Sequence, residues 1–146
     1  MSHRHQINRV ILLIFIITAI PYSSHSNADW ERVDHSTDPS GNIEIVAYAD
    51  DESITHLSYT SKMWGIYDLL NGITQENQKA HSIRFYAEYD CYEPKVRLLD
   101  RAVFEGNMAK GKVLKHVSLT LPWQAVPPES LYESMWLLAC NGHFAK

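Results

Sequence analysis

The 146-residue sequence holds only two cysteines, Cys91 and Cys140, and a spacing of 49 positions separates them. They do not form C-x-x-C, which excludes a thioredoxin-like redox motif. A zinc site would require two further ligands at close spacing, and only His143 lies near either cysteine. A structural disulfide is the leading interpretation, and free thiols or a catalytic or metal-bound cysteine are the alternatives.

Motifs that carry a known chemistry are also absent. There is no G-x-S-x-G elbow, no H-E-x-x-H pair and no EF-hand loop. The segment "GNMAKGK" at residues 106–112 fits the start of a phosphate loop but is followed by Val113, where that loop needs Ser or Thr. We therefore predict no enzymatic activity, no catalytic residue and no cofactor.

Histidines beyond residue 28 are scattered, and none has the i, i+4 or H-x-H spacing of a ligand pair. Their pattern predicts surface side chains and no metal site, with haem or zinc capture by a distant pair as the alternative. These histidines are His35, His56, His81, His116 and His143.

Only one long apolar run exists, from Val10 to Ile20, and it is shorter than the roughly 20 residues that span a membrane. Arg4 and Arg9 precede this run, and small residues follow it. This pattern predicts a signal peptide over residues 1–28, cut before Asp29, and one domain over residues 29–146. No cysteine lies at the cleavage point, so we expect no lipid or other stable membrane anchor. The predicted destination is the periplasm or the medium, and the cell surface is a further candidate.

Positive charge is scarce in the remaining chain, which has 11 basic and 17 acidic residues and a net charge of −6. A net acidic domain lacks the electrostatic footprint of a nucleic-acid-binding protein, so no nucleic-acid partner is expected. Export places both cysteines in an oxidising compartment, which favours the disulfide.

Hydrophobic residues alternate along several segments, as in strands of an antiparallel sheet. The clearest segment, residues 81–92, places Phe85, Ala87 and Cys91 on one side. We expect an acidic turn at residues 50–53, a bulge at Gly65 and a polar loop at residues 71–79 with Asn71-Gly72 as its turn. The expected strands are residues 30–35, 43–50, 54–70, 81–92, 96–105 and 112–119.

The period changes after residue 129, where Ser130 and Glu133 have the spacing of a helix capping box. The pattern predicts a helix over residues 130–142 that ends at Gly142. Its apolar stripe must cover the sheet, so the predicted fold class is α+β: an antiparallel sheet of about six strands, a C-terminal helix packed on one face, and one disulfide.

Aromatic and charged side chains mark a candidate binding surface. Arg84, Tyr86 and Tyr92 share the side of their strand opposite Cys91, and tyrosine with arginine is typical of protein-binding surfaces. The alternative is cross-strand pairs that only stabilise the sheet. Glu88 and Asp90 lie on the same side and are expected to be exposed or paired with Arg84. Three tryptophans are expected in the core or between helix and sheet: Trp64, Trp123 and Trp136.

Several segments, taken in order, resemble the surface-adhesin protein E family of exported Gram-negative proteins. They are "YADDES", "AEYDCYEPKVRLLD", "FEGNMAKGKV", "PWQAVPPES" and "LYESMWLLAC". The resemblance covers residues 30–140 and implies an α+β domain closed by a Cys91–Cys140 disulfide. The family's named member is an adhesin that binds host matrix and serum proteins and can dimerise, so the resemblance implies an adhesin-like protein with a host matrix protein and a second copy of the chain as candidate partners.

Together these observations predict an exported, non-enzymatic, adhesin-like binding module that recognises a protein or another macromolecule. The alternative is a periplasmic housekeeping or envelope-stress protein that binds a component of its own cell envelope.

Overall fold

The computed structural model describes residues 28–38 and 40–144 and contains, within these ranges, seven strands and one helix. The strands are β1 (Trp30–Thr37), β2 (Glu44–Leu57), β3 (Thr60–Gln75), β4 (Gln78–Asp90), β5 (Lys95–Phe104), β6 (Val113–Val117) and β7 (Gln124–Ala125). The helix is α1 (Leu131–Phe144). The predicted signal peptide lies outside the described residues, apart from Ala28. No described helix is both long enough and apolar enough to cross a bilayer.

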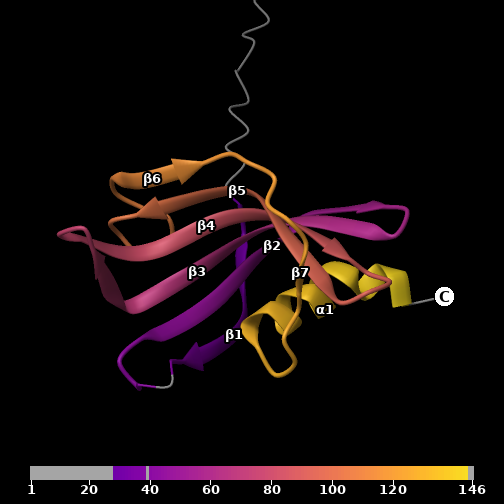
Figure 1. The fold of residues 1–146 in the computed structure, drawn as a ribbon, viewed down its shortest axis with the longest axis horizontal. Coiled ribbons are helices and arrows are strands. Elements are labelled where there is room, and N and C mark those ends of the chain that lie inside the picture. The colour runs from indigo at the N-terminus through magenta and orange to yellow at the C-terminus, as the bar shows by residue number, and fades with distance from the viewer. Residues whose placement is uncertain (1–27, 39, 145–146) are drawn as a thin grey trace, which may run out of the picture.

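Strands β1 to β6 lie side by side in chain order, and each pairs antiparallel with the next (Figure 1). Short connections between neighbouring strands produce this meander. The short strand β7 pairs with the beginning of β5. The predicted antiparallel sheet of about six strands is therefore confirmed, with β7 as an addition to it.

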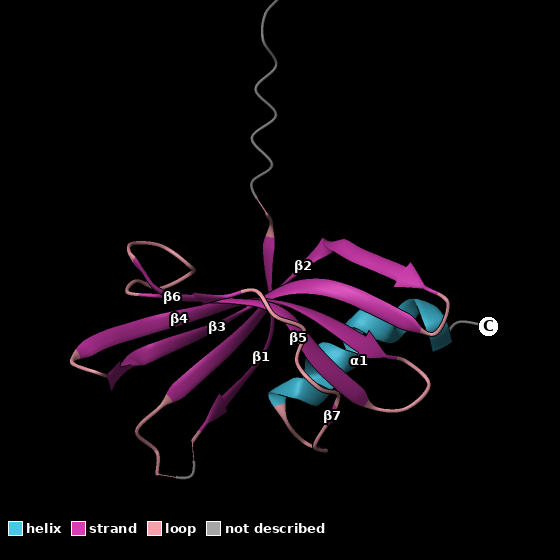
Figure 2. Ribbon diagram, turned by 45° about the horizontal axis from the view of Figure 1, so that its top comes forward, coloured by secondary structure: helices cyan, strands magenta, loops and turns pink. Residues whose placement is uncertain are grey.

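Helix α1 packs on one face of the sheet and contacts strands β1 to β5 (Figure 2). It covers the part of the sheet near the β2–β3 hairpin, whereas the β3–β4 hairpin and β6 extend beyond it in both ribbon views. Phe85, Ala87 and Tyr89 of β4 are buried against Met135 and Ala139 of the helix. The alternation read from the sequence thus gives the correct inner face, and the α+β class is confirmed.

Gly65 is predicted to mark a bulge, but it pairs regularly with Ala49 and Phe85. Its role is close packing. A Cβ atom at this position would lie 2.5 Å from Cζ of Phe85 and 2.7 Å from Cε of Met135. A side chain there would have to displace the core beneath α1.

The predicted acidic turn at residues 50–53 is wrong, because β2 continues through it to Leu57. The pairing with β3 shifts register between Asp50 and Thr55, so extra residues are accommodated as an irregularity within the strand. The chain reverses at Ser58 and Tyr59 instead, within the segment that the sequence predicts as one bent strand. Ser58 has a φ of 50°, and no glycine marks this turn.

The predicted polar loop at residues 71–79 is also wrong, because β3 continues to Gln75. Glu76 and Asn77 make the turn, with φ values of 50° and 63°, as in the mirror-image turns of tight hairpins. Asn71 and Gly72 lie instead where the β3–β4 register shifts, and Gly72 has a φ of +64°. The glycine therefore marks a bulge in the ladder.

The C-terminal helix begins as predicted. The backbone N–H of Glu133 donates to Oγ of Ser130 at 3.3 Å, and the Glu133 carboxylate accepts the N–H of Glu129 at 2.7 Å. Helix hydrogen bonding continues past Gly142 to Phe144, so the predicted stop is wrong. A glycine lowers helix stability by only about 1 kcal/mol and does not end a helix by itself.

A disulfide joins Cys91 and Cys140, with 5.4 Å between their Cα atoms. Cys140 lies in α1, and Cys91 is the first residue after β4 instead of lying within a longer strand. Both residues are buried in the core. The predicted bridge between sheet and helix is confirmed.

Residues 106–111 form a tight loop between β5 and β6. The backbone N–H of Met108 donates to the Asp68 carboxylate at 2.7 Å, and the N–H of Ala109 donates to Oγ of Ser82 at 2.9 Å. These two amides are thus already bonded to β3 and β4, in keeping with a structural turn and not a phosphate loop.

Candidate functional site

The sheet face opposite α1, here called the open face, carries two of the three predicted binding residues. Arg84 and Tyr86 alternate with the buried Phe85 and Ala87 of β4, so their side chains lie on this face. In the β3–β4 register Tyr86 is paired with Trp64 and Arg84 with Ile66. Side chains from β3 and β4 therefore lie next to one another on the open face.

The Tyr86, Trp64 and Arg84 side chains form a stacked group. The rings of Trp64 and Tyr86 lie 4.8 Å apart between centroids at an interplanar angle of 27°. The Arg84 guanidinium carbon lies 5.3 Å from the Trp64 ring and 5.5 Å from the Phe104 ring. Stacking and cation–π contacts of this kind hold such side chains in defined positions.

Beside this group the open face is hollowed. Ala28, Trp30, Asp50, Trp64 and Arg84 line a depression of about 240 Å³, here called the aromatic hollow. Register explains its composition, because Trp30 of β1 is paired with Asp50 of β2 and Asp50 with Trp64 of β3. With Arg84 of β4, four neighbouring strands thus each contribute one side chain to the hollow.

Tyr92, the third predicted residue, lies elsewhere. It follows β4 in the turn before β5 and is 83% exposed, and with Tyr59 and Asp90 it lines a second, open depression of about 420 Å³. Tyr59 belongs to the β2–β3 turn and is 71% exposed. The structure therefore separates Tyr92 from Arg84 and Tyr86, and the single predicted surface consists of two.

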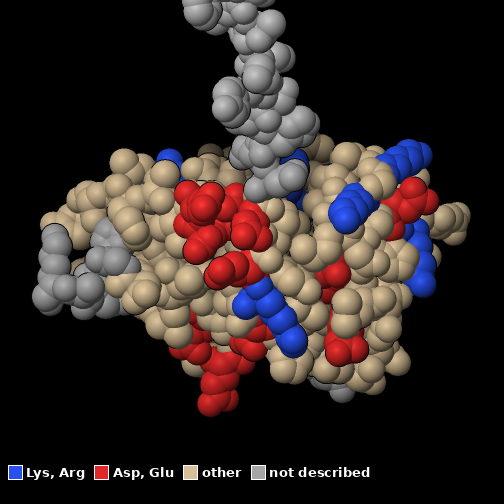
Figure 3. Space-filling model, turned by 180° about the vertical axis from the view of Figure 1, so that it is seen from behind, with Lys and Arg blue, Asp and Glu red and all other residues tan. Residues whose placement is uncertain are grey.

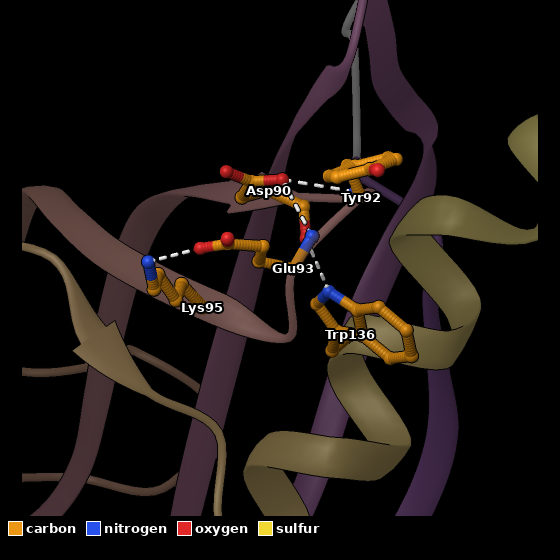
Figure 4. A network of polar contacts seen from close by, with 5 residues as sticks. All are labelled: Asp90, Tyr92, Glu93, Lys95 and Trp136. Atoms are coloured by element: carbon orange, nitrogen blue, oxygen red, sulfur yellow. Dashed lines mark hydrogen bonds and ion pairs between the residues drawn. The ribbon is translucent and has the colours of Figure 1, made fainter.

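The turn that carries Tyr92 is firmly anchored (Figure 4). The Asp90 carboxylate accepts the N–H groups of Tyr92 and Glu93, each at 2.9 Å, and Glu93 forms an ion pair with Lys95. Nε1 of Trp136 in α1 donates to the Asp90 carbonyl at 2.6 Å. This bond, next to the disulfide, fixes the turn to the helix and confirms helix–sheet packing for Trp136.

Three predictions for this region are wrong. Glu88 is buried and pairs with Arg97 at 2.6 Å, not with Arg84, because the β4–β5 register places Arg97 directly opposite. Trp123 is 36% exposed and lies against the Arg97 guanidinium, whose carbon is 4.4 Å from the ring. Trp64, expected in the core, belongs to the open face.

Acidic side chains gather near the middle of the molecular surface seen in Figure 3. Residues 29–76 hold ten acidic and only two basic side chains, whereas the rest of the chain is slightly basic. Asp50 of the aromatic hollow has Asp51 and Glu52 as chain neighbours. The surroundings of the hollow are therefore negatively charged and oppose the approach of anions.

Strongly shifted pKa values occur in the core. Burial raises the pKa of Tyr67 and of Tyr89 well above the usual tyrosine range, and neighbouring tyrosines add to the effect. Both lie in or against the core cluster beneath α1. Within the described ranges no three His, Cys, Asp or Glu side chains converge as a metal-ligand group.

Trp30, Asp50 and Tyr59 are absent from the sequence prediction of the site. The sequence predicts a turn at Asp50 and a core position for Trp64. One signal was available for Trp64, which alternates with Met63 and Gly65 and so must lie on the face opposite to theirs. The positions of Trp30 and Asp50 beside Trp64 follow only from the pairing of β1, β2 and β3.

The sequence matches the family model described as Surface-adhesin protein E over residues 25–141. The chain belongs to the surface-adhesin protein E family. This match confirms the resemblance read from the sequence, and it covers the whole sheet and nearly all of α1. A search among curated proteins found no match.

Solved structures of Haemophilus influenzae protein E are similar to this chain. Crystal form II is 17% identical with a TM-score of 0.50, and the match covers 66% of this chain and 80% of that one. The crystal structure of protein E from non-typeable Haemophilus influenzae is 14% identical with a TM-score of 0.49 and coverages of 86% and 84%. At 17% identity the first likeness shows the shared protein E fold alone, and no binding residue is transferred from it.

Proposed function

We propose that this member of the surface-adhesin protein E family is an exported, non-enzymatic binding module that recognises a macromolecular partner through its open face. The observation that carries the proposal is the stacked group of Trp64, Tyr86 and Arg84 beside the aromatic hollow. Tryptophan, tyrosine and arginine supply most of the binding energy at protein surfaces of this kind. Membership of a family described as surface adhesins supports an adhesin-like role and a host macromolecule as partner.

The stacked group is suited to binding because it is ordered before a partner arrives. Arg84 is held between the Trp64 and Phe104 rings, and Trp64 is held by Tyr86. Rigid side chains lose little conformational entropy on association, which increases the affinity that each contact provides. We expect Arg84 and Tyr86 to be central contacts of the interface.

The decisive experiment measures how much partner the exported protein captures. It compares the unaltered chain with the Arg84→Ala and Tyr86→Ala variants. Each substitution is expected to weaken capture by about tenfold or more, as for central interface residues. Leu137→Ala is the matched control, because Leu137 is an exposed apolar side chain of α1 on the opposite side of the sheet. It is expected to leave capture unchanged.

Tyr92→Ala separates the two surfaces. If Tyr92→Ala abolishes capture while Arg84→Ala and Tyr86→Ala do not, the partner binds around Tyr59 and Tyr92 and the open-face assignment is wrong. The mass of the captured complex and of the free chain in solution also tests the homodimer that the family resemblance implies.

Protease treatment of intact cells distinguishes the adhesin from the alternative role. Digestion of the chain on intact cells supports surface display and a host partner. Protection until the outer membrane is opened, together with cross-links to the cell's own envelope proteins, would instead favour the periplasmic housekeeping or envelope-stress protein.

A further inference from the structure

The aromatic hollow holds two charged groups of opposite sign that do not meet. The Asp50 carboxylate and the Arg84 guanidinium both line it. Neither forms a hydrogen bond or an ion pair with any other described residue, and they do not pair with each other. Two other carboxylates of the same face are paired: Asp100 with His116 at 2.9 Å and Glu88 with Arg97 at 2.6 Å.

Part of the Arg84 guanidinium is buried without a partner. Its Nε atom is the one buried side-chain polar atom in the described residues that lacks a hydrogen bond. A buried donor that is left unsatisfied costs about 1–3 kcal/mol. Most such groups are bonded in native proteins. The Arg84 guanidinium instead lies near the Trp64 and Phe104 rings, which leaves its remaining N–H donors available to a ligand.

Two aromatic rings and Ala28 form the rest of the lining. Trp30 and Trp64 line the hollow from β1 and β3, on either side of Asp50 of β2. Tyr86 stacks on the Trp64 ring and restrains it. The hollow thus combines flat apolar surfaces with one hydrogen-bond acceptor group and one hydrogen-bond donor group, the usual composition of small-ligand sites.

The charges define which ligand fits. An anion would satisfy Arg84 but would meet Asp50 and the acidic surroundings. A cation would satisfy Asp50 but would meet Arg84. A neutral ligand that carries both hydroxyl donors and hydroxyl acceptors satisfies both groups at once, because the carboxylate only accepts and the guanidinium only donates.

We propose that the aromatic hollow binds a pyranose ring of a glycan, with the C–H face of the sugar against the Trp30 and Trp64 indoles and its hydroxyl groups bonded to Asp50 and Arg84. Charge-assisted hydrogen bonds of this kind are stronger than neutral ones. This inference rests on the proposed function and names the chemical class that the open face recognises.

The test is a titration of the chain, expressed with its own leader and collected after export. The probes are the methyl glycosides of glucose, galactose, mannose and N-acetylglucosamine and short oligosaccharides that contain them. Calorimetry and tryptophan emission measure the binding of each probe. We expect saturable binding of at least one probe with a change in emission, because Trp30 and Trp64 lie at the site. Asp50→Ala is expected to weaken this binding about tenfold or more.

Asp100→Ala is the matched control, since it removes a carboxylate from the same face that is already paired with His116. It is expected to change the affinity less than twofold, and far-UV circular dichroism of both variants checks their folding. The absence of saturable binding by every probe overturns the proposal. Equal affinity of Asp50→Ala and the unaltered chain also overturns it.

Failure of this inference is distinguishable from failure of the proposed function. If a glycoprotein partner is captured through Arg84 and Tyr86 equally well after enzymatic removal of its glycans, the sugar site is wrong and the binding module stands. If glycosides bind but capture of a macromolecule does not depend on Arg84 or Tyr86, the proposed open-face interface is wrong and the sugar site stands.

Discussion

Single side chains connect elements that are far apart in the chain. Oγ of Ser134 in α1 donates to the Asp34 carboxylate in β1 at 2.5 Å, across 100 positions of sequence. Asp34 also accepts the N–H of His35 at 2.7 Å. Together these bonds hold the pKa of Asp34 below its usual value, and the Ser134 bond is the larger cause.

Ser134→Ala is expected to lower the free energy of unfolding at pH 7 by about 0.5–1 kcal/mol, the contribution of one hydrogen bond at a largely exposed group. Because the folded pKa of Asp34 lies below the unfolded value of about 3.9, this contribution is complete above that pH. It is lost as the pH falls through the folded pKa. Urea unfolding of both proteins between pH 7 and pH 2 measures the difference.

Ser118→Ala provides the control, because Ser118 is exposed and makes no side-chain hydrogen bond with other described residues. Its stability is expected to match that of the unaltered protein at every pH. A Ser134→Ala difference that persists unchanged at pH 2 would contradict the assignment to Asp34.

Residue-level predictions from the sequence are correct where they depend on alternation alone. Phe85 and Ala87 are buried and Arg84 and Tyr86 lie on the opposite face, because side chains alternate across a strand. The predicted pairing of Glu88 with Arg84 is wrong, because the sheet register places Arg97 of β5 directly opposite Glu88. No spacing within one strand specifies that register.

At the scale of elements, the join between α1 and the sheet determines the shape of the domain. It consists of the apolar packing around Met135, the Trp136 bond to the Asp90 carbonyl and the disulfide. The last two meet at the turn after β4. The end of the sheet that carries Tyr92 is therefore fixed to the helix both covalently and by a hydrogen bond.

Removal of the disulfide by Cys91→Ala with Cys140→Ala is expected to lower the free energy of unfolding by about 4 kcal/mol, because the bridge closes a loop of nearly 50 residues in the unfolded chain. Urea unfolding with and without a reductant measures the effect. The reductant is expected to shift the midpoint of the unaltered protein toward that of the double variant and to leave the double variant unchanged. An unchanged midpoint for the unaltered protein would show that the bridge does not stabilise the domain.

Turns are the elements that the sequence predicts least well. The chain reverses between β2 and β3 at Ser58 and Tyr59, and between β3 and β4 at Glu76 and Asn77. Neither turn contains glycine or proline. Asn71-Gly72, the strongest local turn pattern, lies inside β3. Backbone pairing over 13 to 16 residues in β3 and β4 outweighs such local preferences.

At the scale of the whole molecule, the domain presents two separated surfaces on an acidic body. The aromatic hollow lies on the open face, and Tyr59 and Tyr92 lie at the hairpin end of the sheet. The hollow begins at Ala28, next to the predicted cleavage point. Cleavage at the predicted point would remove Ala28 from the lining of the hollow.

The exported chain is expected to begin at Asp29, because small residues precede that bond and follow an apolar run of signal-peptide length. Its intact mass is expected to be lower than the reduced value by two hydrogens, as one disulfide requires. N-terminal sequencing and mass spectrometry of the exported protein measure both quantities. Ala28→Phe is expected to block processing, and cleavage elsewhere would contradict the predicted leader boundary.

The sequence by itself determined the fold class, the inner face of β4, the start of α1 and the pairing of the two cysteines. Each depends on a local period, on a capping pattern or on the presence of two cysteines in an exported chain. Only the tertiary structure decided where the strands reverse, which charges pair and which residues form the aromatic hollow. The physical reason is that Trp30, Asp50 and Trp64 become neighbours through the register of three strands, and bulges and glycine-free turns set that register.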